Sequence, residues 1–158
     1  MNAPVPGFAE RVFAVFLGLQ AQARQAGTTE QLAFAMANDG QGLFGYRHAA
    51  LLVAGKVRAL TGISVVVPNA PFVAFVEWAA SQRLAAGLLG QSGIVDPASL
   101  GESSREEWQA LSAPNVFWLP LKDRQGAVFG GLWIARDTLW SEAEQALLVQ
   151  LGGTYEHA

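Results

Sequence analysis

The chain has 158 residues, of which 51% are hydrophobic and 15% are charged, and its formal net charge is −3. This length suits one domain with its own core and is short for two, and the acidic balance without any Lys/Arg cluster argues against nucleic acid as a partner. The chain has no cysteine, which excludes disulfides, thiolate metal sites and cysteine nucleophiles.

So few charges are unusual for a monomer that must cover its whole surface. We therefore expect part of the apolar surface to be covered by a partner, by self-association or by a further part of the polypeptide. The apolar runs are shorter than the roughly 18 to 20 residues of a transmembrane helix. Residues 12–19 resemble a signal-peptide core, but Glu10 cancels the charge of Arg11 and the run is short. We therefore expect a cytoplasmic protein without a signal peptide.

The first part of the chain predicts two helices. In the N-terminal region 1–26, residues 6–26 place apolar side chains at spacings of three and four, which indicates a helix. That stripe consists of Phe8, Val12, Val15, Phe16, Leu19 and Ala23. Thr28 and Gln31 form a capping box for a second helix that runs to residue 37.

A glycine-rich loop then leads to Phe44 and to the first predicted strand pair. Residues 46–53 and 56–67 are apolar and β-favouring, and Ala54-Gly55 lies between them as a turn. We expect these two strands to pair as a hairpin.

The middle of the chain predicts a longer helix, an irregular loop and a short helix. Asn69 is a suitable cap for a helix that runs to about residue 86. Residues 87–101 are rich in glycine and are predicted as a loop with a short strand at Ile94-Val95. Ser103 or Ser104 begins the short helix.

Residues 115–136 predict a second hairpin at the centre of the sheet. The apolar runs 116–121 and 127–135 are separated by a charged turn, in which Gly126 can adopt a left-handed conformation. Neither run alternates between polar and apolar residues, which is typical of a strand covered on both faces. A C-terminal helix over 139–156 follows, with Ser141 as its cap.

This order of elements predicts the α+β class. Strand pairs are separated by helices, and the terminal helices can cover one face of an antiparallel sheet. No internal repeat or linker divides the chain, so we expect a single domain over residues 1–158.

The second hairpin and its flanks resemble a GAF domain, a sensory module related in fold to PAS domains. The family pattern is a proline-containing strand, a polar turn with glycine, a Gly-x-Leu strand and a C-terminal helix. Here it consists of Leu119-Pro120-Leu121, 123–126, Gly130-Gly131-Leu132 and 140–151, and Leu51-Leu52-Val53 matches the first strand. The tail from Gly131 to Ala158 is also similar to GAF-type regions before the membrane anchor of some periplasmic adaptor (membrane-fusion) proteins. That similarity implies a membrane contact only through a segment outside this chain.

The GAF resemblance implies an antiparallel sheet of five or six strands. The N- and C-terminal helices would pack on one face, and residues 68–111 would roof a pocket on the other. The methionine-sulfoxide reductases and bilin-binding phytochromes of the family need cysteines, which are absent here. The Asn-Lys-x-Phe-Asp-Glu and Arg-x-x-Asp signatures of its nucleotide-binding branches are also absent. We therefore expect no cofactor.

Catalytic and metal-binding sets are not evident in the sequence. His48 and His157 have no neighbouring pattern of ligands or catalytic partners, and no serine lies in a Gly-x-Ser-x-Gly motif. The glycines at 87, 90 and 93 do not have the spacing of a phosphate-binding loop, so a flexible lid is expected there. We predict that the chain is not an enzyme and holds no metal.

The candidate ligand-binding residues come from the predicted roof and the central hairpin. Arg83 either reaches the pocket or complements the end of its helix from solvent. Trp78 and Trp108 either line the pocket or belong to the core. The full candidate set is Phe72, Phe75, Trp78, Arg83, Trp108, Phe117 and Trp133.

Two functions follow as hypotheses. The first is a non-enzymatic regulatory or interaction module of a larger protein, which pairs with a second copy or a partner domain through its terminal helices. The alternative is a sensor that binds an unknown small molecule under residues 68–111. The side chains that the central hairpin directs toward the roof decide between them, because three aromatic rings there would fill the pocket.

Overall fold

The computed structural model describes residues 17–18, 21, 29–38, 41–62, 66, 70–96 and 105–156. Most of the helix predicted over 6–26 therefore lies outside the described residues. The same holds for the predicted cap residues Asn69, Ser103 and Ser104, and for His157.

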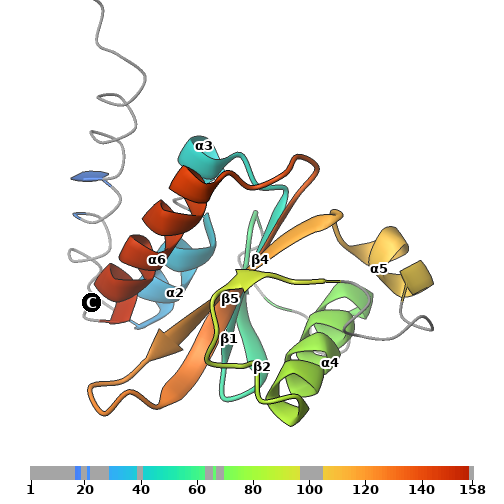
Figure 1. Cartoon of the computed structure of the whole chain (residues 1–158), viewed down its shortest axis with the longest axis horizontal. Helices are drawn as coiled ribbons and strands as arrows, with labels where there is room; N and C mark the ends of the chain where they lie inside the picture. Colours follow the sequence, from blue (N-terminus) through green and yellow to red (C-terminus); the bar gives the residue numbers. More distant parts are fainter. Residues whose placement is uncertain are drawn as a thin grey trace, which may run out of the picture.

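Five antiparallel strands form one sheet in the order β2-β1-β5-β4-β3 (Figure 1). Their bounds are β1 His48–Val53, β2 Lys56–Leu60, β3 Gly93–Ile94, β4 Asn115–Lys122 and β5 Val128–Arg136. The predicted second hairpin is β4–β5, and β5 is the middle strand of the sheet. The predicted α+β class and the central position of this hairpin are confirmed.

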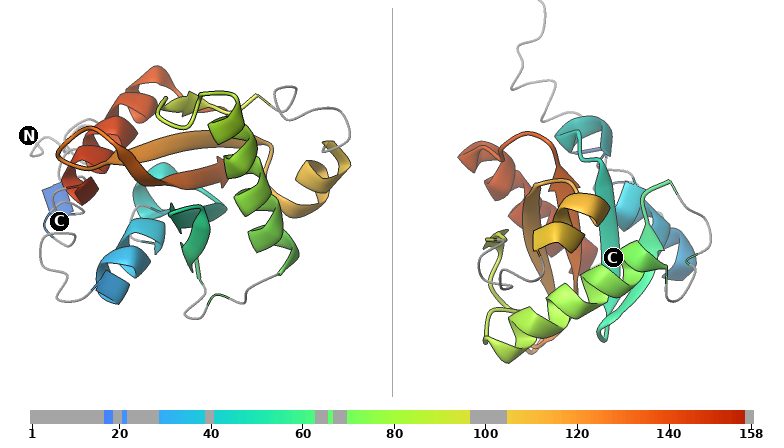
Figure 2. Two further views of the ribbon diagram at one scale, coloured as in Figure 1. Left: turned by 90° about the horizontal axis from the view of Figure 1, so that it is seen from below. Right: turned by 90° about the vertical axis from the view of Figure 1, so that its right-hand side faces the viewer.

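Helices cover both faces of the sheet (Figures 1 and 2). One face carries α2 (Thr29–Asn38) and α6 (Glu142–Glu156), and the other carries α4 (Pro71–Ala85) and α5 (Arg105–Leu111). The fold is therefore a three-layer arrangement in which the sheet lies between two helical layers.

Three local predictions were wrong. The glycine-rich loop before Phe44 contains a single helical turn, α3 (Gln41–Phe44), closed by a hydrogen bond of 2.8 Å from Gly45 N–H to the Gln41 carbonyl. Strand β2 ends at Leu60 instead of residue 67, because Gly62 has a φ of 74° and donates its N–H to Asn38 Oδ1. The N-cap of α4 is Ala70, without a side-chain hydrogen bond.

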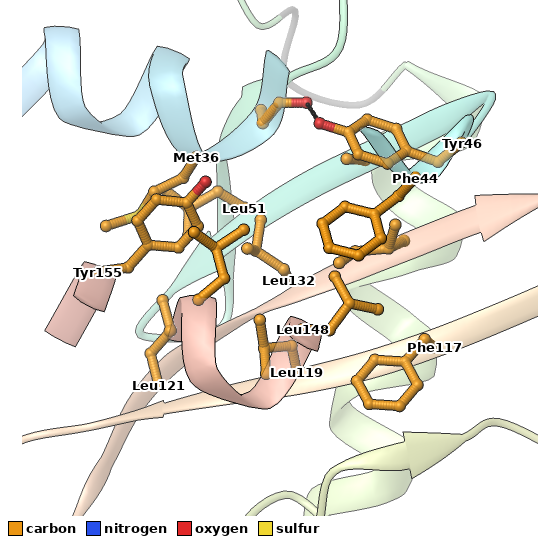
Figure 3. Close-up of a cluster of buried hydrophobic side chains, with 14 of the residues drawn as sticks. Met36, Phe44, Tyr46, Leu51, Phe117, Leu119, Leu121, Leu132, Leu148 and Tyr155 are labelled. Carbon is orange, nitrogen blue, oxygen red and sulfur yellow. Dashed lines mark hydrogen bonds between the residues drawn. The ribbon is translucent and has the colours of Figure 1, made fainter. Parts of the chain in front are cut away.

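The central hairpin is buried on both faces, as predicted. Residues Phe117, Leu119 and Leu132 point toward α2 and α6 and join a cluster that Figure 3 shows. Trp118 and Trp133 belong to the cluster on the opposite face, beside α4 and α5. Successive residues of a strand point to opposite faces, so an unbroken apolar run needs a helical layer on each.

The absence of a side chain at Gly131 leaves space for the ring of Trp118. A Cβ added at Gly131 would lie 2.4 Å from Cζ2 of Trp118, and one added at Gly130 would lie 2.1 Å from the Leu52 carbonyl oxygen. Both distances are shorter than any tolerable carbon contact. The Gly-Gly-Leu segment of the GAF pattern is thus required by packing within this sheet.

Strand β3 pairs with only a short part of β4, at Phe117 and Trp118. The rest of this edge of β4 is protected against pairing with another strand. Val116 accepts a hydrogen bond of 2.9 Å from Val95 N–H, which shows that the backbone groups of residues 116, 118, 120 and 122 face this edge. Pro120 has no N–H to offer there, and Lys122 N–H donates to Glu156 Oε1 at 2.8 Å. This geometry explains why a proline is tolerated next to the centre of the sheet.

Arg136 joins the end of β5 to the start of α6. Its guanidinium donates to both carboxylate oxygens of Glu144 at 2.6 Å and to the Phe44 carbonyl at 2.7 Å, and it lies 3.9 Å from the centre of the Trp140 ring. Glu144 also forms the predicted capping box with Ser141, through two hydrogen bonds of 3.1 Å. The hydrogen bond from Arg136, more than any other contact, lowers the pKa of Glu144 to about 2.

Substitution of Gly131 by alanine tests the close packing of the hairpin. We expect the Gly131→Ala protein to lose about 2 kcal/mol of unfolding free energy, because the methyl group overlaps the Trp118 ring. Urea denaturation followed by tryptophan fluorescence measures this. Gly153→Ala is the matched control, since nothing lies within 4 Å of its added Cβ and alanine favours the helix. Equal stability of Gly131→Ala and wild type would contradict the packing.

Acid should weaken the Arg136–Glu144 junction. Glu144 has a folded pKa of about 2 against an ordinary value of 4.5, so its stabilising contribution is complete above about pH 4.5 and is lost as the pH falls toward 2. At pH 7 we expect Glu144→Gln to be less stable than wild type by about 2 kcal/mol.

The difference between the two proteins should shrink as the pH falls from 5 to 2. Thermal unfolding followed by circular dichroism over this range measures it. Glu142→Gln, an exposed neighbour in the same helical turn, is the control and should stay close to wild type. A pH-independent difference between wild type and Glu144→Gln would refute the role of this carboxylate.

Candidate functional site

The face of the sheet toward α4 and α5 is where the sequence predicts a pocket, and an aromatic cluster occupies it. The Trp133 ring lies 5.3 Å from the Trp108 ring and 5.9 Å from the Phe75 ring, measured between ring centres. Phe75 and Trp108 are 6.1 Å apart in an edge-to-face arrangement. All three rings are buried. The structure therefore brings three of the predicted site residues together, and their rings pack against one another.

Each indole N–H of this face has a partner within the protein. Trp108 donates to the Ala113 carbonyl at 3.2 Å, Trp133 to the Ser112 hydroxyl at 3.3 Å, and Trp118 to the Leu89 carbonyl at 2.8 Å. Ligand pockets usually present a few polar groups that converge on an open space. Here the three indole N–H groups instead form hydrogen bonds within the protein.

Trp118 and Ser112 were not among the predicted site residues. Trp118 follows Phe117 in β4, and only the register of the strand decides which of the two faces the roof. In the structure, Trp118 is the residue that faces the roof. Ser112 is buried directly after α5, where nothing in the sequence distinguishes it from other serines.

Phe117 lies on the opposite face from the predicted pocket. Its ring centre is 6.2 Å from that of Trp140, and it belongs to the cluster under α2 and α6 (Figure 3). The expectation that Phe117 lines the roof side is wrong, because side chains alternate along β4 and Trp118 takes that side.

Phe72 borders a small hollow at the other end of α4. Its ring lies 5.1 Å from the His48 ring, and together with Ala49, Leu60 and Thr61 these residues enclose about 50 Å³. Drug-sized ligands need about 300 to 1,000 Å³, so this hollow has room for a few water molecules. Burial lowers the pKa of His48, Arg47 lowers it further and Asp137 opposes them, which leaves the imidazole neutral at pH 7.

Arg83 holds the loop after α4 and does not extend into solvent. It is 7% exposed, and its Nη2 donates to the carbonyls of Leu88 at 3.2 Å and Gln91 at 3.1 Å. Burial lowers the pKa of its guanidinium. The loop predicted as a flexible lid is therefore tied by Arg83 on one side and by the Trp118 indole, through Leu89, on the other.

Trp78 lies on the outer side of α4, away from the aromatic cluster. Its ring is 6.2 Å from that of Phe75 and remains 36% exposed. It is part of the molecular surface and is not among the residues that line the hollow at Phe72.

Metal and membrane sites were searched over the part of the chain that the structure describes. There, no three His, Asp or Glu side chains are grouped so that they could hold a metal ion. Among the same residues, no helix has both the length and the apolar character needed to cross a bilayer.

Neither a protein-family model nor a curated protein sequence matches this chain. Solved structures do match it. The GAF domain of a phosphoenolpyruvate-protein phosphotransferase from Acinetobacter superposes with a TM-score of 0.61 at 12% identity, covering 92% of this chain and 90% of that domain. The chromophore-binding domain of a Stigmatella aurantiaca phytochrome gives a TM-score of 0.64 at 13% identity and covers 99% of this chain and 62% of the phytochrome chain.

A methyl-accepting chemotaxis protein, over its residues 122 to 287, gives a TM-score of 0.58 at 12% identity, covering 91% of this chain and 94% of that one. At such low identity the likeness concerns the fold alone. None of these neighbours is a membrane-fusion adaptor, and the comparisons do not support that part of the resemblance. The strand order, the two helical layers and these superpositions together show that the chain has the fold of GAF domains.

Proposed function

We propose that this chain is a single-domain, non-enzymatic regulatory or interaction module of GAF type that works in the cytoplasm as part of a larger protein. The observation that carries the proposal is the packed aromatic cluster of Phe75, Trp108 and Trp133, which occupies the space where a ligand would lie. The structural neighbours of the chain include sensory and regulatory proteins, which agrees with the proposed role.

The outer face of α6 supports dimerisation through the terminal helices. From Gln145 to Tyr155 the helix has no charged residue, and its exposed side includes Ala143, Ala146 and Val149, the last of which is 48% exposed. A helix face without charge can pack against a second helix at little desolvation cost. The helix predicted over residues 6–26 would complete such a bundle.

The sensor hypothesis is less well supported. Among the residues that the structure describes, it requires either that the aromatic rings separate or that the ligand enters the hollow between His48 and Phe72. The first would break three indole hydrogen bonds and uncover buried rings. The second offers about 50 Å³, which is too small for most metabolites.

Charge introduced on the outer face of α6 should prevent dimerisation. We expect the wild-type chain to be a dimer at low protein concentration and the double variant Ala146→Glu/Val149→Glu to be a monomer at that concentration, because four carboxylates would meet across a two-fold contact. Size-exclusion chromatography with light scattering measures the mass. Gln109→Glu, an exposed site on α5, adds charge on the opposite helical layer and should leave the dimer intact. A wild-type protein that stays monomeric at high concentration would contradict dimerisation.

Small-molecule screening should find no stabilising ligand. We expect nucleotides, amino acids and organic acids to leave the melting temperature within about 1 °C in a thermal-shift assay, whereas a ligand at 100 times its Kd would add about 2.7 kcal/mol. A reproducible rise that Phe72→Ala abolishes and Gln109→Glu preserves would favour the sensor hypothesis and locate the ligand at the hollow.

A further inference from the structure

Helix α4 is mostly apolar although one side of it faces solvent, and Ser81 and Gln82 are the polar residues on that side. It contains only two charged residues, Glu77 and Arg83, and neither lies on the exposed side. Glu77 accepts a hydrogen bond of 3.0 Å from Val57 N–H and lies 3.8 Å from Lys56 Nζ, and Arg83 is buried against its own loop. A helix without a polar face is usually covered on all sides.

The uncovered side of α4 is centred on Trp78. This residue is the eighth of the fifteen in the helix, and most of the other exposed positions recur at three, four or seven residues from it. They are Pro71, Ala74, Ser81, Gln82 and Ala85, and Leu84 is also exposed, six residues after Trp78. A half-exposed indole with alanine and serine on either side provides a ridge and grooves of the kind that pack against a second helix.

The two sides of this surface have opposite charge. Strand β2 lies beside the edge of α4 that carries Glu77, and it exposes Lys56 and Arg58. Helix α5 lies beside the opposite edge of α4, where Phe75 contacts Trp108. This helix contains one arginine and two exposed carboxylates, Glu106 and Glu107. Figure 2 shows α5 and β2 on either side of α4. A basic border, an uncharged centre and an acidic border therefore follow one another across the face.

We propose that the α4 face is a self-association surface that binds a second copy of this chain. With a two-fold axis parallel to the helices, the borders exchange sides, so that Arg58 of each copy faces Glu106 and Glu107 of the other, while Trp78 packs at the centre. An axis in the contact plane perpendicular to the helices would place like charges opposite each other. Charge complementarity therefore selects a second copy in parallel orientation as the occupant.

This contact is separate from dimerisation through the terminal helices. Helix α4 lies on one face of the sheet and α6 on the other, so one chain can make both contacts at once. A surface built around one helix is small for a permanent interface, and we expect concentration-dependent association that high salt weakens.

Substitution of Trp78 tests the centre of the surface. Sedimentation velocity over a concentration series, with Ala146→Glu/Val149→Glu present throughout, isolates this contact. We expect Trp78→Glu to raise the dissociation constant about 30-fold or more, as for a central tryptophan in other interfaces. Ala74→Glu should act in the same way without removing a large side chain, and Ala127→Glu on the exposed hairpin turn is the control. Association that neither α4 substitution changes would overturn the proposal.

Charge exchange tests the partner and its orientation. Arg58→Glu and Glu106→Lys/Glu107→Lys should each weaken self-association about fivefold or more, because each places like charges across the contact. An equimolar mixture of these two variants should recover association, since one border of the mixed dimer pairs opposite charges as in the wild type and the other pairs them with the signs exchanged. Recovery in the mixture supports the parallel pairing. Weakening without recovery would overturn it.

Discussion

Burial of the β4–β5 hairpin on both faces is the constraint on which the rest of the structure depends. Each large apolar side chain removed from water contributes about 1.5 to 3 kcal/mol, and the hairpin directs such side chains to both sides. One helical layer cannot cover two faces, so α2 and α6 take one and α4 and α5 the other. Within the hairpin, Gly131 leaves room for the Trp118 ring, which lies 2.4 Å from where a Cβ of residue 131 would be.

The junction at Arg136 fixes how the helical layer of α6 meets this hairpin. The guanidinium is buried, and its donors are shared among Glu144, the Phe44 carbonyl and the backbone after β5. A buried cation is tolerated only when it is paired and hydrogen-bonded, and here both conditions hold. The same carboxylate caps α6 together with Ser141. The Arg136–Glu144 ion pair therefore joins the end of β5 to the start of α6, and the Phe44 carbonyl links α3 to the same guanidinium.

The packing that stabilises the sheet also places three indole rings on the α4 side. Trp108, Trp118 and Trp133 all lie there, and their indole N–H groups bond to the loops that border the cluster. On the outer surface, the exposed sides of α4 and α6 carry few charges. Among the described residues, the fold of GAF domains is thus combined with a packed aromatic cluster on the α4 side.

The amino-acid sequence by itself determined the element types, the α+β class, the central place of 115–136 and the capping of α6 by Ser141, because these depend on local periodicity and turn chemistry. It also named Phe75, Trp108 and Trp133 among seven candidate site residues, and the structure brings these three together. Only the tertiary structure decided that Trp118 and not Phe117 faces the roof, that Arg83 is buried and that Trp78 is not. Strand register and helix rotation are set by contacts between distant segments, and a one-residue change in register moves every side chain of a strand to the other face of the sheet.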